Sequence, residues 1–135
     1  IYPYNNVPEL TEDVKGVILS GSPCSVRDNE HPTIDLSQFM GKLPLLGVCY
    51  GAQLIAYEHQ GEVTPSTIRE YGRARLTELH TANRLMKELT PGSVVWMSHG
   101  DEVTDVPAGF TIIASSPTCR CSASPVAIRH WFLPS

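Results

Sequence analysis

The sequence predicts an α/β sandwich with a mostly parallel sheet, because strand-like and helix-like segments alternate along the chain. Two short apolar runs, residues 16–20 and 44–48, have the length and branching of buried strands. The stretch that follows Cys49 instead repeats its apolar residues at the spacing of a helix face. Turn residues separate these segments, which suits short connections within one domain.

The composition limits the kinds of partner. A chain of 135 residues has the usual size of one domain. Its net charge of −4, without a basic run, argues against nucleic-acid binding. No apolar run reaches the roughly 20 residues of a membrane span, and Ile1–Asn6 lacks the pattern of a signal peptide. We therefore expect a cytoplasmic protein that binds neither membrane nor nucleic acid.

The first sixty residues supply the clearest elements. Gly16–Ser20 predicts a short buried strand that ends in the turn Gly21–Pro23. A polar loop then leads into a short helical stretch over residues 34–40. After Cys49, apolar residues recur at i, i+3 and i+4, so we expect a helix that packs on the sheet until Gly61 stops it.

The second half gives weaker signals. Thr67–Leu76 mixes charges with a glycine and is expected to be a turn that enters a strand. A threonine N-cap and a following Pro-Gly pair predict a helix over Ala82–Leu89. Val94–Met97 predicts a strand that ends in Ser98–Asp101, and Phe110–Ala114 predicts the last strand.

One cysteine has the setting of a catalytic nucleophile. Cys49 lies between Gly47 and Gly51 where the predicted strand becomes a helix, which is the layout of a nucleophile elbow. Glycines permit a tight bend, and the start of a helix offers N–H groups and a positive dipole end that favour a thiolate. We therefore predict nucleophilic catalysis at this position.

The other cysteines do not form a metal-binding pattern. Cys119 and Cys121 form a C-x-C pair without a second pair or an H-x(3–5)-H partner, so no metal site is expected. Cys24 lacks an elbow around it. It is expected to be a small buried or loop thiol.

Four segments together resemble a known family: Gly21–Pro23 (GSP), Gly47–Gln53 (GVCYGAQ), Arg69–Arg73 (REYGR) and Trp96–Asp101 (WMSHGD). The chain resembles the class I glutamine amidotransferase domain of GMP synthetase. A G-x-C-x-G run alone fits several hydrolase families, but the order and spacing of all four segments are far more specific. The resemblance implies a three-layer, flavodoxin-like sandwich, here incomplete.

The resemblance also implies a reaction. In that family a cysteine thiolate attacks the side-chain amide of glutamine, ammonia leaves, and water releases glutamate from the thioester. Cys49 takes the place of the nucleophile. The backbone N–H groups of Tyr50 and Ser22 match the oxyanion hole. The family more often has a second glycine where this chain has Ser22, so the loop must accommodate a Cβ.

Substrate and partner follow from the same resemblance. Gln53 takes the place of a residue that holds the glutamine substrate, and backbone groups of Ser98, His99 and Gly100 resemble the clamp on its α-amino and α-carboxylate groups. The REYGR segment lines the pocket or faces the synthetase portion. That ATP-pyrophosphatase portion uses ATP and Mg²⁺, whereas the sequence here contains no loop for ATP, so no cofactor is expected in this chain.

The family's base and acid have no counterpart in the sequence. An activated cysteine needs a base and a group that orients it, and the family supplies both from a G-x-Q-F-H-P-E segment that does not occur here. The chain has five histidines: His31, His59, His80, His99 and His130. His31 precedes the elbow, His59 is expected to be a core or rim residue, and His130 lacks the Pro-Glu that would orient it.

The chain is expected to be a single partial domain over residues 1–135, with an atypical tail from about residue 117. A truncated or out-of-frame reading of a longer gene would explain this tail and the absence of the family's first strand and helix. Three functional interpretations stay open: a glutaminase domain for a GMP-forming synthetase, a non-catalytic or partner-binding remnant, and an amidotransferase or other cysteine hydrolase of a different pathway.

Overall fold

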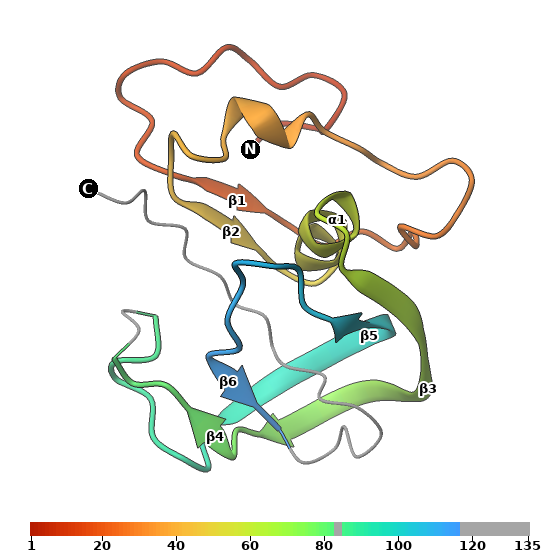
Figure 1. Cartoon of the computed structure of the whole chain (residues 1–135), viewed down its shortest axis with the longest axis vertical. Coiled ribbons are helices and arrows are strands. Elements are labelled where there is room, and N and C mark those ends of the chain that lie inside the picture. The colour runs from red at the N-terminus through yellow and green to blue at the C-terminus, as the bar shows by residue number, and fades with distance from the viewer. Residues whose placement is uncertain (83–84, 117–135) are drawn as a thin grey trace.

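The computed structural model describes residues 1–82 and 85–116, without the side chains of residues 67–71, 98 and 99. Its elements, drawn in Figure 1, are β1 (Val17–Leu19), the 3-10 helix η1 (Leu36–Gln38), β2 (Leu45–Gly47), α1 (Tyr50–Glu58), β3 (Glu62–Arg75), β4 (Glu78–Leu79), β5 (Val94–Asp105) and β6 (Ala114–Ser115). No helix in these two ranges is both long enough and apolar enough to cross a membrane. The atypical tail, residues 117–135, lies outside the described residues.

The described strands form three two-stranded sheets. β1 and β2 are parallel, with Val17 opposite Leu45 and Leu19 opposite Gly47. β3 pairs with β5, and β4 with β6, both antiparallel. The α/β character is therefore confirmed, but these residues do not form the mostly parallel central sheet of the expected three-layer sandwich. Apolar runs predict that a strand is buried, and they do not determine which strand it pairs with.

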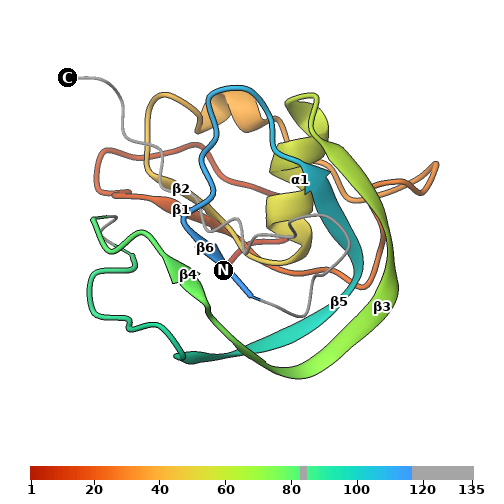
Figure 2. The same ribbon diagram turned by 60° about the horizontal axis from the view of Figure 1, so that its bottom comes forward.

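The β3–β5 pair is a long twisted ribbon that packs beside α1 (Figure 2). Its register shifts between Pro65, opposite Asp101, and Glu70, opposite His99, so extra residues of β3 bulge opposite Gly100. β5 thus continues to Asp105, whereas the sequence predicted that the strand ends at Ser98–Asp101. Those polar residues pair with β3 and do not terminate the strand.

Two further predictions for the second half were wrong. The described part of Ala82–Leu89 forms turns and no helix. So short a segment cannot form a stable helix without tertiary support, and here the turns bury Met86 against Leu76. The strand predicted over Phe110–Ala114 begins only at Ala114, because Phe110 still belongs to a turn in which its N–H bonds the carbonyl oxygen of Pro107.

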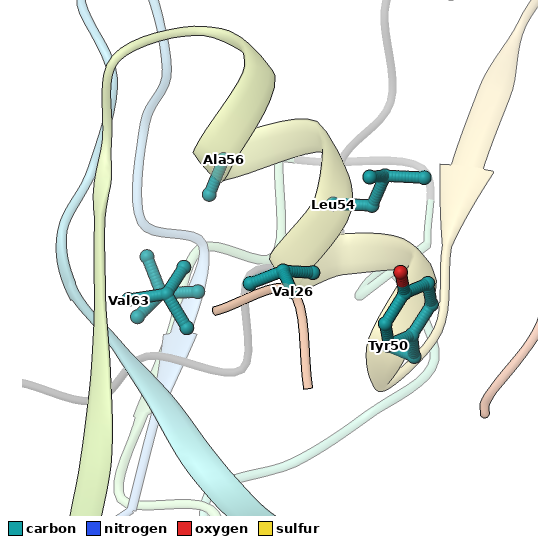
Figure 3. Packing of buried hydrophobic residues seen from close by; sticks show 6 residues of the cluster. Val26, Tyr50, Leu54, Ala56 and Val63 are labelled. Carbon is teal, nitrogen blue, oxygen red and sulfur yellow. The ribbon is translucent and has the colours of Figure 1, made fainter. Parts of the chain in front are cut away.

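Helix α1 supplies the centre of the core. One hydrophobic cluster joins α1 to β3, β5 and the loop after β1 (Figure 3): Val26, Tyr50, Leu54, Ala56, Val63 and Val103. A second cluster joins Ile55 of α1 to β2 and to the short helical stretch: Leu36, Phe39, Leu45 and Ile55. The predictions of a helix after Cys49 and of a short helical stretch at residues 34–40 are confirmed.

The end of α1 differs slightly from the expected one. Gln60 takes the left-handed conformation, with φ of 66°, and the N–H of Gly61 bonds the carbonyl oxygen of Ala56 at 2.8 Å. This is a Schellman closure with glutamine in the position that usually holds glycine. Gly61 is needed for space instead, since a Cβ there would lie 2.8 Å from the carbonyl oxygen of Asp105.

The first turn of α1 lies unusually close to β1. A Cβ on Gly51 would lie 2.3 Å from the carbonyl oxygen of Leu19 and 2.6 Å from its Cβ. Backbone atoms cannot move aside as the end of a flexible side chain can. The contact between helix and strand therefore requires glycine at position 51.

Gly51→Ala is expected to lower the free energy of unfolding by about 1–3 kcal/mol, because the added methyl group forces α1 away from β1. Urea denaturation of the purified chain measures this change. Gly100→Ala is the matched control, since a Cβ at Gly100 would meet no atom within 4 Å. Equal destabilisation by both substitutions would contradict the close contact as the cause.

Candidate active site

Cys49 forms a strained elbow between β2 and α1. It is the N-cap of α1, with φ of 54° and ψ of −115°, and its side chain is exposed. A non-glycine residue with positive φ is uncommon and is often found at functional sites. This conformation turns the cysteine out of the strand at the start of the helix, as the sequence predicted.

The flanking glycines act differently from what we expected. Neither Gly47 nor Gly51 has a positive φ, so the bend is made by the cysteine itself. A Cβ on Gly47 would lie 2.7 Å from the backbone nitrogen of Ala52. The two glycines therefore permit the strand and the helix to approach closely, and this approach holds Cys49 in its strained conformation.

The turn after β1 lies beside the cysteine. A Cβ built on Gly21 would lie 3.6 Å from Cβ and 3.9 Å from Sγ of Cys49. The next residue, Ser22, accepts a hydrogen bond at its Oγ from the N–H of Cys24 at 3.2 Å, so its side chain is turned toward its own loop. The loop thus accommodates the Cβ that the family usually lacks at this position.

The two backbone N–H groups that were predicted to bind the oxyanion belong to Tyr50, at the start of α1, and to Ser22, which follows Gly21 in the turn beside Cys49. Tyr50 is the first residue of α1, where N–H groups lack helical acceptors. Within residues 1–82 and 85–116, neither this N–H nor that of Ser22 donates to a backbone acceptor. The positive end of the helix dipole adds to their attraction for negative charge.

Gln53 is buried rather than solvated on the helix. It is 8% exposed, and its Nε2 donates to the carbonyl oxygen of Asp101 at 2.9 Å. Asp101 follows the segment Ser98–Gly100, whose first two residues pair with Tyr71 and Glu70 of β3. Gly100 lies opposite the β3 bulge, and a Cβ there would face open space. The structure therefore brings Gln53 next to the segment that was predicted to hold substrate.

Comparison with known proteins identifies the family. The model of the class I glutamine amidotransferase family matches residues 1–131. The chain belongs to this family. As the order of its segments suggested, the chain is also 59% identical over 123 residues to a glutamine-hydrolyzing GMP synthase of Cytophaga hutchinsonii, covering 91% of this chain and 24% of that protein.

Two further matches are also GMP synthases or subunits of them. A glutamine-hydrolyzing GMP synthase of Bacteroides fragilis is 51% identical over 123 residues, again 91% of this chain and 24% of the relative. A crystal structure of a candidate GMP synthase subunit from Thermoplasma acidophilum matches with a TM-score of 0.59 and 28% identity, over 80% of this chain and 55% of that one. The chain thus has the fold of its family and spans about a quarter of the length of the curated relatives.

Asp101 is the site residue that sequence reasoning did not assign. Its carboxylate accepts hydrogen bonds from the hydroxyl of Ser25 and from Nη2 of Arg27, the latter at 3.1 Å. The WMSHGD segment included this aspartate, but no sequence pattern indicates that it contacts residues more than seventy positions earlier. The contact connects the loop after β1 to β5.

Two of the described histidines, His31 and His59, contact backbone carbonyl oxygens. His59 is the C-cap of α1, about 15 Å from the helix start at 1.5 Å per residue, and its Nδ1 contacts the carbonyl oxygen of Ile55 at 2.9 Å. The expectation of a rim residue there is confirmed. Nδ1 of His31 contacts the carbonyl oxygen of Asp28 at 2.8 Å, and its ring meets Tyr57 edge-on. The side chain of His99 and all of His130 lie outside the described residues.

No group of three or more His, Cys, Asp and Glu side chains that could hold a metal occurs in residues 1–82 and 85–116. Cys24 was predicted to be either a buried thiol or a loop thiol. It is exposed, which agrees with the loop thiol. Cys119 and Cys121 lie outside the described residues.

Tyr50 joins the site to the core. It is 4% exposed, and its hydroxyl donates to the carbonyl oxygen of Pro32 at 2.5 Å. Burial, followed by the nearby groups Cys24 and Asp28, raises the pKa of Tyr50 above the ordinary value of 10.0. The phenol therefore stays neutral in the folded chain at a pH at which an unfolded tyrosine ionises.

This raised pKa predicts a loss of stability in alkali. The contribution of Tyr50 is fully present below about pH 10 and is lost as the pH rises from there through the higher folded pKa, because only the unfolded state releases the proton. Urea denaturation between pH 8 and pH 11 measures the slope. Tyr50→Phe is expected to weaken the dependence of the free energy of unfolding on pH. Tyr2→Phe, at a position that is 66% exposed, is the control and leaves this dependence unchanged. An equally steep slope in Tyr50→Phe would contradict this assignment.

Proposed function

We propose that this chain is the glutamine amidotransferase portion of a GMP synthase and that it hydrolyses glutamine to supply ammonia for the conversion of XMP to GMP. The observation that carries the proposal is the strained Cys49 elbow, with the Gly21–Ser22 turn beside it and Gln53 one helical turn further along α1. The similarity to glutamine-hydrolyzing GMP synthases supports the same function.

The chemistry begins at Cys49. Its thiolate attacks the side-chain amide carbon of glutamine, and the carbonyl oxygen becomes an oxyanion in a tetrahedral intermediate. The N–H groups of Tyr50 and Ser22 donate to this oxyanion, and each such preorganised donor contributes about 3 kcal/mol to the transition state. The amide nitrogen takes up, by way of solvent, the proton that the thiol released when it ionised, and it leaves as ammonia. Water then hydrolyses the thioester to glutamate and the free thiol.

The substrate lies across α1 and β5. Gln53, together with backbone groups of Ser98, His99 and Gly100, holds the glutamine. The bulge of β3 supports this role for Gly100, because it interrupts the ladder opposite that residue. The REYGR segment, which forms the next part of β3, lines the pocket or faces the synthetase portion.

The partner is the ATP-pyrophosphatase portion of a GMP synthase, in the cytoplasm. ATP and Mg²⁺ belong to that partner, and this chain needs no cofactor of its own. The sequence contains no G-x-Q-F-H-P-E run. The chain alone therefore turns over glutamine slowly or not at all, while its binding site and its nucleophile remain testable.

A glutamine-shaped electrophile tests the site without requiring turnover. A diazoketone analogue of glutamine is expected to alkylate Cys49, because its carbonyl occupies the position of the substrate amide. Peptide mass spectrometry locates the adduct, and excess glutamine is expected to slow its formation, whereas excess asparagine does not.

The control uses Cys24, which is exposed like Cys49. Cys49→Ala removes the adduct, and Cys24→Ala retains it at the rate of the natural sequence. Labelling at both cysteines without protection by glutamine would refute a glutamine site. In a parallel assay, glutamate release that disappears in Cys49→Ala would show that the chain contains its own base.

A further inference from the structure

The tripeptide Ser25–Arg27 fixes the loop that follows β1. Its central residue, Val26, is 0% exposed and lies in the hydrophobic cluster with Tyr50 and Leu54 of α1 and Val63 of β3 (Figure 3). A valine without any exposed surface anchors its backbone at that point. The loop is therefore held to α1 only a few residues after the Gly21–Ser22 turn.

The residues on either side of Val26 contact one carboxylate. The hydroxyl of Ser25 donates to Oδ2 of Asp101, and Nη2 of Arg27 donates to Oδ1 at 3.1 Å. The Asp101 side chain is 11% exposed and that of Arg27 is 40% exposed. Both carboxylate oxygens are thus used, and the charge of the mostly buried carboxylate is compensated by a cation from the loop.

The loop is also bonded within itself. The N–H of Ser25 donates to Oδ2 of Asp28 at 3.0 Å, and the N–H of Arg27 donates to Oγ of Ser25 at 3.1 Å. The N–H of Asp28 donates back to the carbonyl oxygen of Ser25 at 3.2 Å. Ser25 therefore connects the internal turn of the loop to Asp101.

Asp101 completes the connection to the nucleophile helix. Its carbonyl oxygen accepts a hydrogen bond at 2.9 Å from Nε2 of Gln53. Gln53 lies on α1, one helical turn after Cys49. One residue thus bonds the loop through its side chain and α1 through its backbone. Only two residues separate Ser22 from Ser25, so the docked Ser25 limits how far the N–H of Ser22 can move.

We propose that Ser25 and Arg27 are positioning residues that hold the Ser22 N–H beside Cys49 by docking the loop on Asp101. This inference rests on the proposed glutaminase site for its kinetic consequence. Oxyanion donors act on the transition state more than on the bound substrate, so loss of either docking bond slows the reaction at Cys49 without weakening binding of the glutamine analogue.

The kinetic test measures the maximal inactivation rate and the half-saturating concentration of the diazoketone glutamine analogue. Arg27→Met is expected to lower the maximal rate by about two- to fivefold, the range of a partly exposed ion pair, with half-saturation changed less than twofold. Ser25→Ala is also expected to lower the maximal inactivation rate. Arg27→Lys restores most of the rate, and Arg75→Met, which removes an exposed arginine that bonds Gly92 on another loop, has no effect.

Asp101 itself is left unchanged in this test because it adjoins the segment that is proposed to hold substrate. A rise in half-saturation with an unchanged maximal rate would overturn the positioning role, as would equal effects of Arg27→Met and Arg75→Met. Urea denaturation accompanies each variant, so that a global loss of stability is separated from a local one.

Amide hydrogen exchange tests the docking independently of the glutamine site. In Arg27→Met, peptides that contain Gly21–Arg27 are expected to exchange at least severalfold faster, while peptides from the second half of α1 keep their protection. Unchanged exchange in the loop would overturn the inference. A third outcome separates the two proposals. If the loop exchanges faster in Arg27→Met but glutamine does not protect Cys49 from labelling even in the natural sequence, the docking is retained and the proposed function is refuted.

Discussion

The close approach of α1 to the ends of β1 and β2 is the constraint on which the site depends. It is permitted by the missing side chains of Gly47 and Gly51, and Cys49 passes from strand to helix within it through a positive φ. Strain of this kind persists only when the surroundings over-determine it. Here the surroundings are backbone atoms on both sides, which can yield little.

The site and the core share the same elements. Helix α1 contributes Tyr50 and Leu54 to one hydrophobic cluster and Ile55 to another, while its first turn presents the cysteine and its second turn presents Gln53. Hydrophobic burial thus fixes the helix, and a small number of polar bonds at Asp101 determine how the neighbouring loop and strand meet it. Packing supplies the stability, and the polar contacts supply the geometry.

The parts that could be predicted from the sequence are local. Cys49 between two glycines, the strand before it and the helix after it follow from spacing and turn chemistry. The pairing of β3 with β5 could not be predicted. The polar residues Ser98–Asp101 are typical of a strand end, and only the pairing with β3 shows that the strand continues through them. The bonds of Ser25 and Arg27 to Asp101 were equally hidden, since nothing local in a sequence reveals a contact between distant segments. The helix over Ala82–Leu89 failed because propensity is weak without packing.

Tyr50 shows how differently a backbone and its side chain can be constrained. The group assigned to the chemistry is an N–H, which any residue except proline provides, whereas the ring is buried and its hydroxyl is bonded to Pro32. The core therefore determines which residue stands here, whereas the proposed role of its N–H depends only on its position at the start of α1. Natural variation at position 50 would then record the shape of the cavity around the ring, and it would carry little information about the substrate.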